Sequence, residues 1–168
     1  WTPRWNRVSD FMRFDHELHF QYFGQYKSRP QSQPDLADQM CCVGACWMMP
    51  RTRYWEIEGM DESCGSWGQM GVEVACKSWL SGGRQVVNKH TWFAHLFRTQ
   101  TGFGFPYPNP GIEKARQRSR ETWLNNSWPK QIHPLSWLLD KFWPVPGWSE
   151  DIGKDALALV RSQGDKFN

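Results

Sequence analysis

The sequence predicts an α/β or α+β fold in which a small mixed sheet is flanked by helices. Three observations support this class. Residues 41–49, CCVGACWMM, are a short apolar run of the kind that a buried strand shows. Residues 66–83 contain the start, the apolar stripe and the end of one helix. Strand-like segments at 85–87 and 91–97 precede further helical segments, so the two element types are mixed along the chain.

The first part of the chain shows less regular signals. Residues 1–26 contain scattered aromatic side chains without a clear helical period. Residues 27–38 are polar and contain two prolines, which predicts an exposed loop. After the apolar run, Pro50 can open a short helix. Gly59 would cap that helix at its end.

The next helix has the clearest local signals. Ser66 and Gln69 fit a capping box, in which the hydroxyl and the amide satisfy free backbone N–H groups. Apolar residues then recur along one helical face, namely Val72, Ala75, Cys76, Trp79 and Leu80. The Ser81-Gly82-Gly83 run predicts a left-handed cap at the end of the helix. We expect the apolar face to pack onto the sheet, with Trp79 fully buried.

The last third of the chain predicts three more helices. Asn109 and Pro110 can start the first of them. Its basic residues predict a solvated face, and they are Lys114, Arg116, Arg118 and Arg120. Residues 129–148 are rich in Trp and Pro, and they predict a short helix at 135–142 and an extended tail. A last helix is expected at 151–160.

The composition argues against several classes of protein. The chain of 168 residues is the size of one domain, and its formal charge of +3 is small for a dedicated nucleic-acid binder. No apolar run reaches the roughly 18 residues of a membrane span, and the first residues lack the order of a signal peptide. Five cysteines are a poor disulfide framework. We therefore expect a cytoplasmic protein with neither a membrane nor a nucleic-acid partner.

Two local patterns resemble metal sites but have plainer interpretations. The run Asp15-His16-Glu17-Leu18-His19 places its histidines three residues apart, whereas the helix of a zinc protease needs them four apart. We interpret the run as solvated surface. Cys41, Cys42 and Cys46 lack two pairs of thiolate ligands at zinc-finger spacing, and we interpret them as small buried hydrophobes.

Five segments have an order and a spacing that resemble those of one enzyme family. They are GACWMM at 44–49, EGMDE at 58–62, SWGQMGVE at 66–73, WLSGG at 79–83 and WFAHLFR at 92–98. In these features the chain resembles the acceptor-side, C-terminal half of a family-2-type GT-A glycosyltransferase. It is similar in particular to the catalytic domains of polypeptide N-acetylgalactosaminyltransferases and to their prokaryotic and phage relatives. The resemblance covers about residues 14–128.

The resemblance implies a partial GT-A fold that lacks the nucleotide-binding half. The chain then divides into an aromatic N-terminal segment with a polar loop at 1–38, a GT-A half at 39–128 and a Trp- and Pro-rich tail at 129–168. The family transfers a sugar from a metal-bound nucleotide-sugar to a hydroxyl of a glycan or polypeptide. Because the sequence contains no Asp-x-Asp or Asp-x-His metal motif, we expect a glycosyltransferase-derived domain that is inactive alone. Its partner would be the missing N-terminal half or a second copy in a homodimer. A non-catalytic glycan-binding or assembly module is the alternative.

On the donor side, the resemblance assigns roles to four residues. Gly44 and Ala45 would lie beside the donor sugar. His95 would be a ligand of the divalent metal, Mn²⁺ or Mg²⁺, to which a neutral imidazole is a suitable ligand. Arg98 would face the diphosphate, which suits a planar guanidinium. Taken without the resemblance, His95 is interpreted as a hydrogen-bonded core residue.

On the acceptor side, the resemblance places Trp67, Gly68 and Glu73. Relatives carry an acidic residue where this chain has Met70 and Gly71, neither of which can accept a proton. The remaining candidates for a catalytic base are Asp61, Glu62 and Glu73. Trp67 also suits plain packing at a helix start, and Asp61 also suits the capping of a turn.

Overall fold

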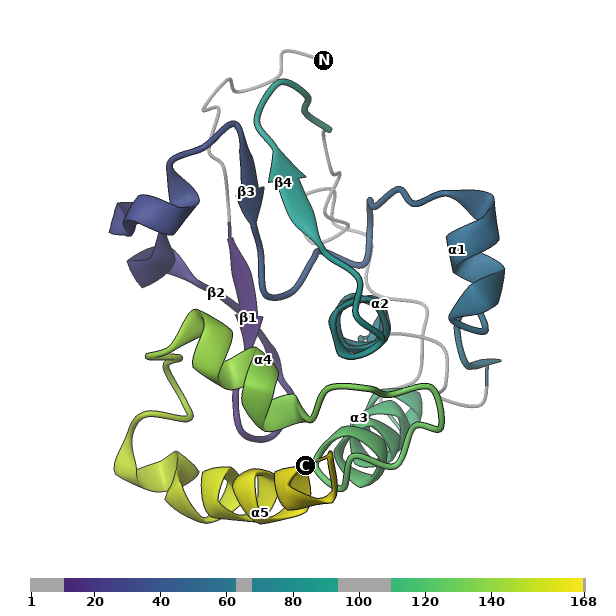
Figure 1. The fold of residues 1–168 in the computed structure, drawn as a ribbon, viewed down its shortest axis with the longest axis vertical. Helices are drawn as coiled ribbons and strands as arrows, with labels where there is room; N and C mark the ends of the chain where they lie inside the picture. The colour runs from purple at the N-terminus through teal and green to yellow at the C-terminus, as the bar shows by residue number, and fades with distance from the viewer. Residues whose placement is uncertain (1–10, 63–67, 94–109, 168) are drawn as a thin grey trace.

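The structure is a computed structural model, and it describes residues 11–62, 68–93 and 110–167. These residues mix helices with short strands (Figure 1), as the sequence predicts in outline. The helices are α1 (Arg51–Glu56), α2 (Met70–Leu80), α3 (Pro110–Trp123), α4 (Leu135–Phe142) and α5 (Lys154–Gly164). The strands are β1 (Met12–Phe14), β2 (Phe20–Tyr22), β3 (Leu36–Asp38) and β4 (Val86–Asn88). Among the described residues, no helix has the length and apolar character needed to cross a membrane.

Within the described residues, the strands form two separate antiparallel pairs rather than one mixed sheet. Strand β1 pairs with β2, with Met12 opposite Tyr22, and β3 pairs with β4, with Leu36 opposite Asn88. Strand β4 lies within one residue of the predicted segment at 85–87. Because two strands of three residues are marginal alone, the pairs depend on the helices that pack against them.

The strand predicted at 41–49 is wrong. Cys41 makes one isolated bridge with Met12, and the residues that follow it are loop. The loop passes directly over the start of α2, where a Cβ added to Gly71 would lie 2.0 Å from the Cys42 carbonyl oxygen. Only glycine permits so close an approach. The apolar run therefore packs against the start of α2 and does not pair with a strand after Cys41.

Helix α2 confirms the predicted apolar stripe and its end. Its stripe residues are all buried, and Trp79 is 2% exposed. Gly82 adopts a positive φ of 80° after the helix ends, as a left-handed cap requires. The predicted capping box is wrong at Gln69, whose side chain makes no cap. Its amide donates instead to the Leu18 carbonyl oxygen at 3.2 Å, and Ser66 lies outside the described residues.

The C-terminal part of the chain completes the core around α2. Helix α4 has the predicted bounds, and it packs against α2 and α5 (Figure 1). The residues after α4 are not an extended tail, because Val145 and Trp148 are both fully buried. Residues 27–38 are likewise more than an exposed loop, since they contain β3 and the buried Ala37.

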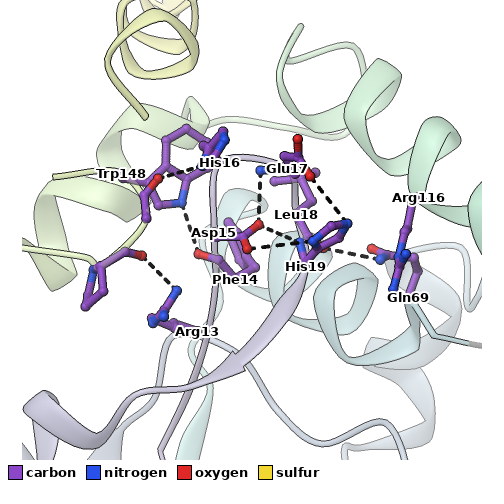
Figure 2. Close-up of polar contacts among 12 residues, drawn as sticks. Arg13, Phe14, Asp15, His16, Glu17, Leu18, His19, Gln69, Arg116 and Trp148 are labelled. Atoms are coloured by element: carbon purple, nitrogen blue, oxygen red, sulfur yellow. Dashed lines mark hydrogen bonds and ion pairs between the residues drawn. The ribbon is translucent and has the colours of Figure 1, made fainter. Parts of the chain in front are cut away.

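Polar contacts join the β1–β2 hairpin to the segment after α4 (Figure 2). The Trp148 indole N–H donates to the Phe14 carbonyl oxygen at 3.0 Å, and Arg13 Nη1 donates to the Pro146 carbonyl oxygen at 2.8 Å. His16 Nδ1 lies 2.8 Å from the Gly147 carbonyl oxygen. These contacts position the hairpin against the core from the far end of the chain.

The run from Asp15 to His19 is the turn of this hairpin rather than plain solvated surface. The Asp15 carboxylate accepts the N–H groups of Glu17 and His19 (Figure 2), at 3.0 and 2.9 Å. Leu18 has a positive φ of 59° and is fully buried. The solvated-surface interpretation is therefore wrong for Leu18, because the turn directs that side chain into the core.

The four cysteines that the structure describes are free thiols. Cys41, Cys42 and Cys76 are buried, whereas Cys46 is exposed, which corrects its interpretation as a buried residue. Burial raises the pKa of the Cys41 and Cys76 thiols well above the ordinary value, and it raises the pKa of Cys42 to about 11.

We expect native alkylation at pH 8 to modify Cys46 and to spare the three buried thiols. The thiolate is the reactive form, and a thiol with a pKa of about 11 is ionised in roughly one molecule in a thousand at that pH. Peptide-level mass spectrometry after iodoacetamide treatment measures each site, and the same reaction in denaturant should label all five cysteines of the sequence. Native labelling of Cys76 as fast as Cys46 would contradict the packing.

Candidate functional site

A pocket of about 470 Å³ lies between α2, α3 and the loop that follows α1. Its lining includes all three predicted base candidates, Asp61, Glu62 and Glu73. Asp61 and Glu62 come from the loop, whereas Glu73 lies on the first turn of α2. The structure therefore brings together residues from two of the segments on which the resemblance rests.

A buried ion pair forms one wall of the pocket. Glu73 and Lys77 lie one turn apart on α2, where side chains meet, and Lys77 Nζ is 2.8 Å from Glu73 Oε1. Their side chains are 7% and 6% exposed. The same Glu73 oxygen accepts the Asp61 N–H at 2.7 Å, and Lys77 Nζ donates to the Gly59 carbonyl oxygen at 2.7 Å. The pair thus fastens the loop to α2.

Two tryptophans supply the apolar part of the wall. The rings of Trp123 and Trp128 meet edge to face, with centroids 5.9 Å apart. Lys77 Nζ lies 5.9 Å from the centroid of the Trp128 ring. The Trp128 indole N–H donates to Glu58 Oε2 at 3.4 Å. Trp128 therefore contacts charged side chains from both α2 and the loop after α1.

Helix α3 forms the wall opposite the loop, and sequence reasoning missed its contribution. Arg118, Ser119 and Thr122 line the pocket from this helix. Arg118 Nε lies 3.8 Å from Asp61 Oδ2, so one residue of the predicted solvated face turns toward the site. The sequence does contain a signal for the buried face of α3. Three residues spaced by four, which are all buried in the structure, mark that face, and they are Ala115, Ser119 and Trp123.

Of the predicted donor-side residues, Gly44 and Ala45 are described by the structure, and neither lines this pocket. Gly44 packs against Met70 and Gly71, since a Cβ added to it would lie 3.2 Å from the Met70 Cβ. Successive residues of a helix are about 100° apart around its axis. Glu73 therefore projects roughly 200° around α2 from Gly71, so the pocket and the loop of Gly44 lie on different faces of the helix. Ala45 is exposed on the same loop as Gly44.

Gly68 lies beside the start of α3, where an added Cβ would be 3.4 Å from the Ile112 Cγ2. Gly68 is exposed and has a positive φ of 104°. Trp67, His95 and Arg98 lie outside the described residues. Among the residues that the structure does describe, no group of three or more His, Cys, Asp and Glu side chains is arranged to hold a metal ion.

No protein-family model and no curated protein matches this chain. The pocket itself combines carboxylates, which accept hydrogen bonds, with hydroxyls, which both donate and accept. Its volume falls within the roughly 300–1,000 Å³ of ordinary small-molecule sites. The arrangement can therefore hold a small ligand that is rich in hydrogen-bonding groups.

Proposed function

We propose that residues 14–128 are the acceptor-side half of a GT-A glycosyltransferase domain. In the intact family such a domain transfers a sugar from a metal-bound nucleotide-sugar to a hydroxyl acceptor. The observation that supports this proposal is the convergence of Asp61, Glu62 and Glu73 on one pocket. The EGMDE and SWGQMGVE segments are apart in the sequence, and a shared acceptor site accounts for their meeting.

The contacts suggest different roles for the three acids. Glu73 is held by Lys77 and by the Asp61 N–H, so we assign it to positioning the loop. Glu62 is exposed at the pocket, and we assign it to contact with the acceptor hydroxyl. A divalent metal with His95 as a ligand, and a diphosphate facing Arg98, belong to the same proposal. When bound, the metal would offset charge on the leaving diphosphate.

The partner and the compartment are also part of the proposal. We propose that the nucleotide-binding half or a second copy of the chain contacts the exposed apolar side chains near α1, where Trp55 is 64% exposed and Met48 is 96% exposed. A cytoplasmic location agrees with the free thiols of the four described cysteines.

One observation favours a second candidate, a non-catalytic glycan-binding or assembly module. Glu73 is engaged as a structural ion pair, and Met70 and Gly71 stand where relatives carry acids. A module of this kind would keep the acceptor surface and would lose the ability to abstract a proton from the acceptor.

We expect the 168 residues alone to turn over no nucleotide-sugar. The physical reason is that they contain no Asp-x-Asp or Asp-x-His motif to hold the metal and diphosphate. Assays of nucleotide release from UDP- and GDP-sugars with Mn²⁺ check this, with a complete GT-A enzyme as the positive control. Metal-dependent turnover by the pure chain would refute the expectation.

The deciding experiment is to read the coding sequence immediately upstream and to express any in-frame extension. We expect a βαβ unit that ends in Asp-x-Asp or Asp-x-His, and sugar transfer by the extended protein with Mn²⁺. Glu62→Gln in that protein should lower kcat by about 10²–10⁴-fold if Glu62 is the base. Glu17→Gln on the β1–β2 hairpin is the matched control, because Glu17 does not line the pocket. Transfer that Glu62→Gln leaves unchanged would favour another base. An extended protein without transfer would leave the binding-module candidate.

A further inference from the structure

Helix α1 has few attachments to the rest of the protein. It contains no buried side chain, and Figure 1 shows it at the edge of the molecule, away from α4 and α5. Two of its side chains turn inward. The Tyr54 ring stacks on the Trp47 ring, with centroids 6.3 Å apart, and Arg53 Nη2 donates to the Ser81 hydroxyl. A helix of this length is marginal without packing, so a partner on its exposed face would stabilise it.

The outward face of α1 combines an indole ring with charged ends. Since a helix turns by about 100° per residue, one arc of roughly 140° holds four of its six residues. All four are exposed, and they are Arg51, Thr52, Trp55 and Glu56. Met48, just before the helix, is exposed as well. Tryptophan is among the side chains that most often dominate the affinity of a protein interface.

The charges at the two ends of α1 are the reverse of those that its own dipole favours. A helix is stabilised by acidic side chains near its N-terminus and by basic ones near its C-terminus. Helix α1 begins with Arg51, has no acidic residue in its first turn, and ends with Glu56. Arg53 Nη1 lies 3.0 Å from Glu56 Oε2, but the Glu56 side chain remains 66% exposed. The first turn therefore favours an acidic partner, and Glu56 favours a basic one.

A second copy of α1 that runs antiparallel to the first meets both requirements. When Arg51 of one protomer lies beside the partner's Glu56, the partner's carboxylate also lies near the positive end of the helix dipole. A two-fold axis repeats the contact, so that the partner's Arg51 lies beside Glu56. The same register sets Trp55 against the partner's Thr52. The outward face of α1 is thus complementary to itself in charge.

We propose that the protein forms a two-fold dimer in which the α1 helices of two copies pack antiparallel. This inference names the second copy as the occupant of the surface near α1, and in that choice it deepens the proposed function and rests on it. The contact itself is argued from the residues of α1, so it can be measured on the chain of 168 residues. Because the surface is small, we expect reversible association with a Kd on the order of 10 μM.

The first test is sedimentation velocity over protein concentrations on both sides of that Kd. Trp55→Ala should weaken the dimer by roughly 30-fold or more, as the loss of a central indole does. Because Trp55 is exposed in each protomer, its circular dichroism spectrum should be unchanged. Lys154→Glu is the control, since Lys154 is exposed on α5, away from α1 (Figure 1), and this variant should dimerise like the native protein.

The second test reverses one charge at a time. Arg51→Glu sets two carboxylates beside each other at both contacts, and Glu56→Arg does the same with two guanidinium groups. Each variant alone should self-associate roughly tenfold more weakly. A mixture of the two variants should form a heterodimer at least as tight as the native dimer, because every contact then joins opposite charges.

Three outcomes would overturn the inference. They are a monomer at every concentration, a dimer that Trp55→Ala leaves unchanged, and a mixture of the reversed variants that associates no better than either variant alone. A dimer of the expected kind, together with an extended protein that transfers no sugar, would refute the proposed enzyme and leave the dimer standing. Sugar transfer by an extended protein that stays monomeric would refute the dimer and leave the enzyme standing.

Discussion

Replacing Trp79 with alanine should lower the free energy of unfolding by about 3–5 kcal/mol, the usual cost of removing a large buried ring. The ring is 2% exposed, and it meets the Phe142 ring edge to face at 5.7 Å. Its indole N–H also donates to the Gln39 carbonyl oxygen at 3.1 Å, in a buried position. The substitution therefore leaves both a cavity between α2 and α4 and an unpaired carbonyl group.

Chemical denaturation followed by circular dichroism measures this loss. Trp79→Phe keeps an aromatic ring but loses the N–H donor, so it should cost clearly less than the alanine change. Trp55→Ala is the matched control, because Trp55 is 64% exposed on α1, and it should cost about 0.5 kcal/mol or less. Equal losses for Trp79→Ala and Trp55→Ala would show that α2 does not pack as described.

Replacing Lys77 with methionine should lower the free energy of unfolding by about 3–5 kcal/mol as well, for an electrostatic reason. The change leaves the Glu73 carboxylate buried without its counter-ion. It also removes the donor to the Gly59 carbonyl oxygen, so the loop that carries Asp61 loses one of its attachments to α2.

The double variant Glu73→Leu/Lys77→Met separates the charge effect from the packing effect. Replacing a whole buried pair by apolar residues is often neutral or stabilising, so the double variant should be more stable than Lys77→Met alone. With the native protein and the single variant Glu73→Leu, these two variants form a double-mutant cycle, and urea denaturation gives each free energy. A double variant that is no more stable than Lys77→Met would contradict a destabilising unpaired carboxylate in the single variant.

Sequence reasoning succeeded where a signal is local and repeated. The stripe of α2 follows from the helical period, which a single helix fixes without reference to its neighbours. It failed at 41–49, because an apolar run does not distinguish a buried strand from a loop that crosses a helix. It also missed β1 and β2, whose three residues each are too short for a periodic signal.

The candidate site shows the same division. Asp61, Glu62 and Glu73 follow from the motifs that contain them, and the structure brings all three to the lining of one pocket. Ser119 was missed because the charged residues around it dominate the pattern of α3, although its spacing from Trp123 places both on the buried face. The i, i+4 spacing of Glu73 and Lys77 indicates that the two side chains can meet. It does not reveal that the pair is buried, because burial depends on the packing of other segments.

The contact between Trp148 and Phe14 has a consequence for synthesis on the ribosome. The two residues are 134 positions apart, and translation at about 5–20 residues per second separates their appearance by on the order of 10 s. During that interval the aromatic side chains around β1 and β2 have no C-terminal segment to cover them. The nascent segment around β1 and β2 is therefore one that we expect a ribosome-associated chaperone to bind.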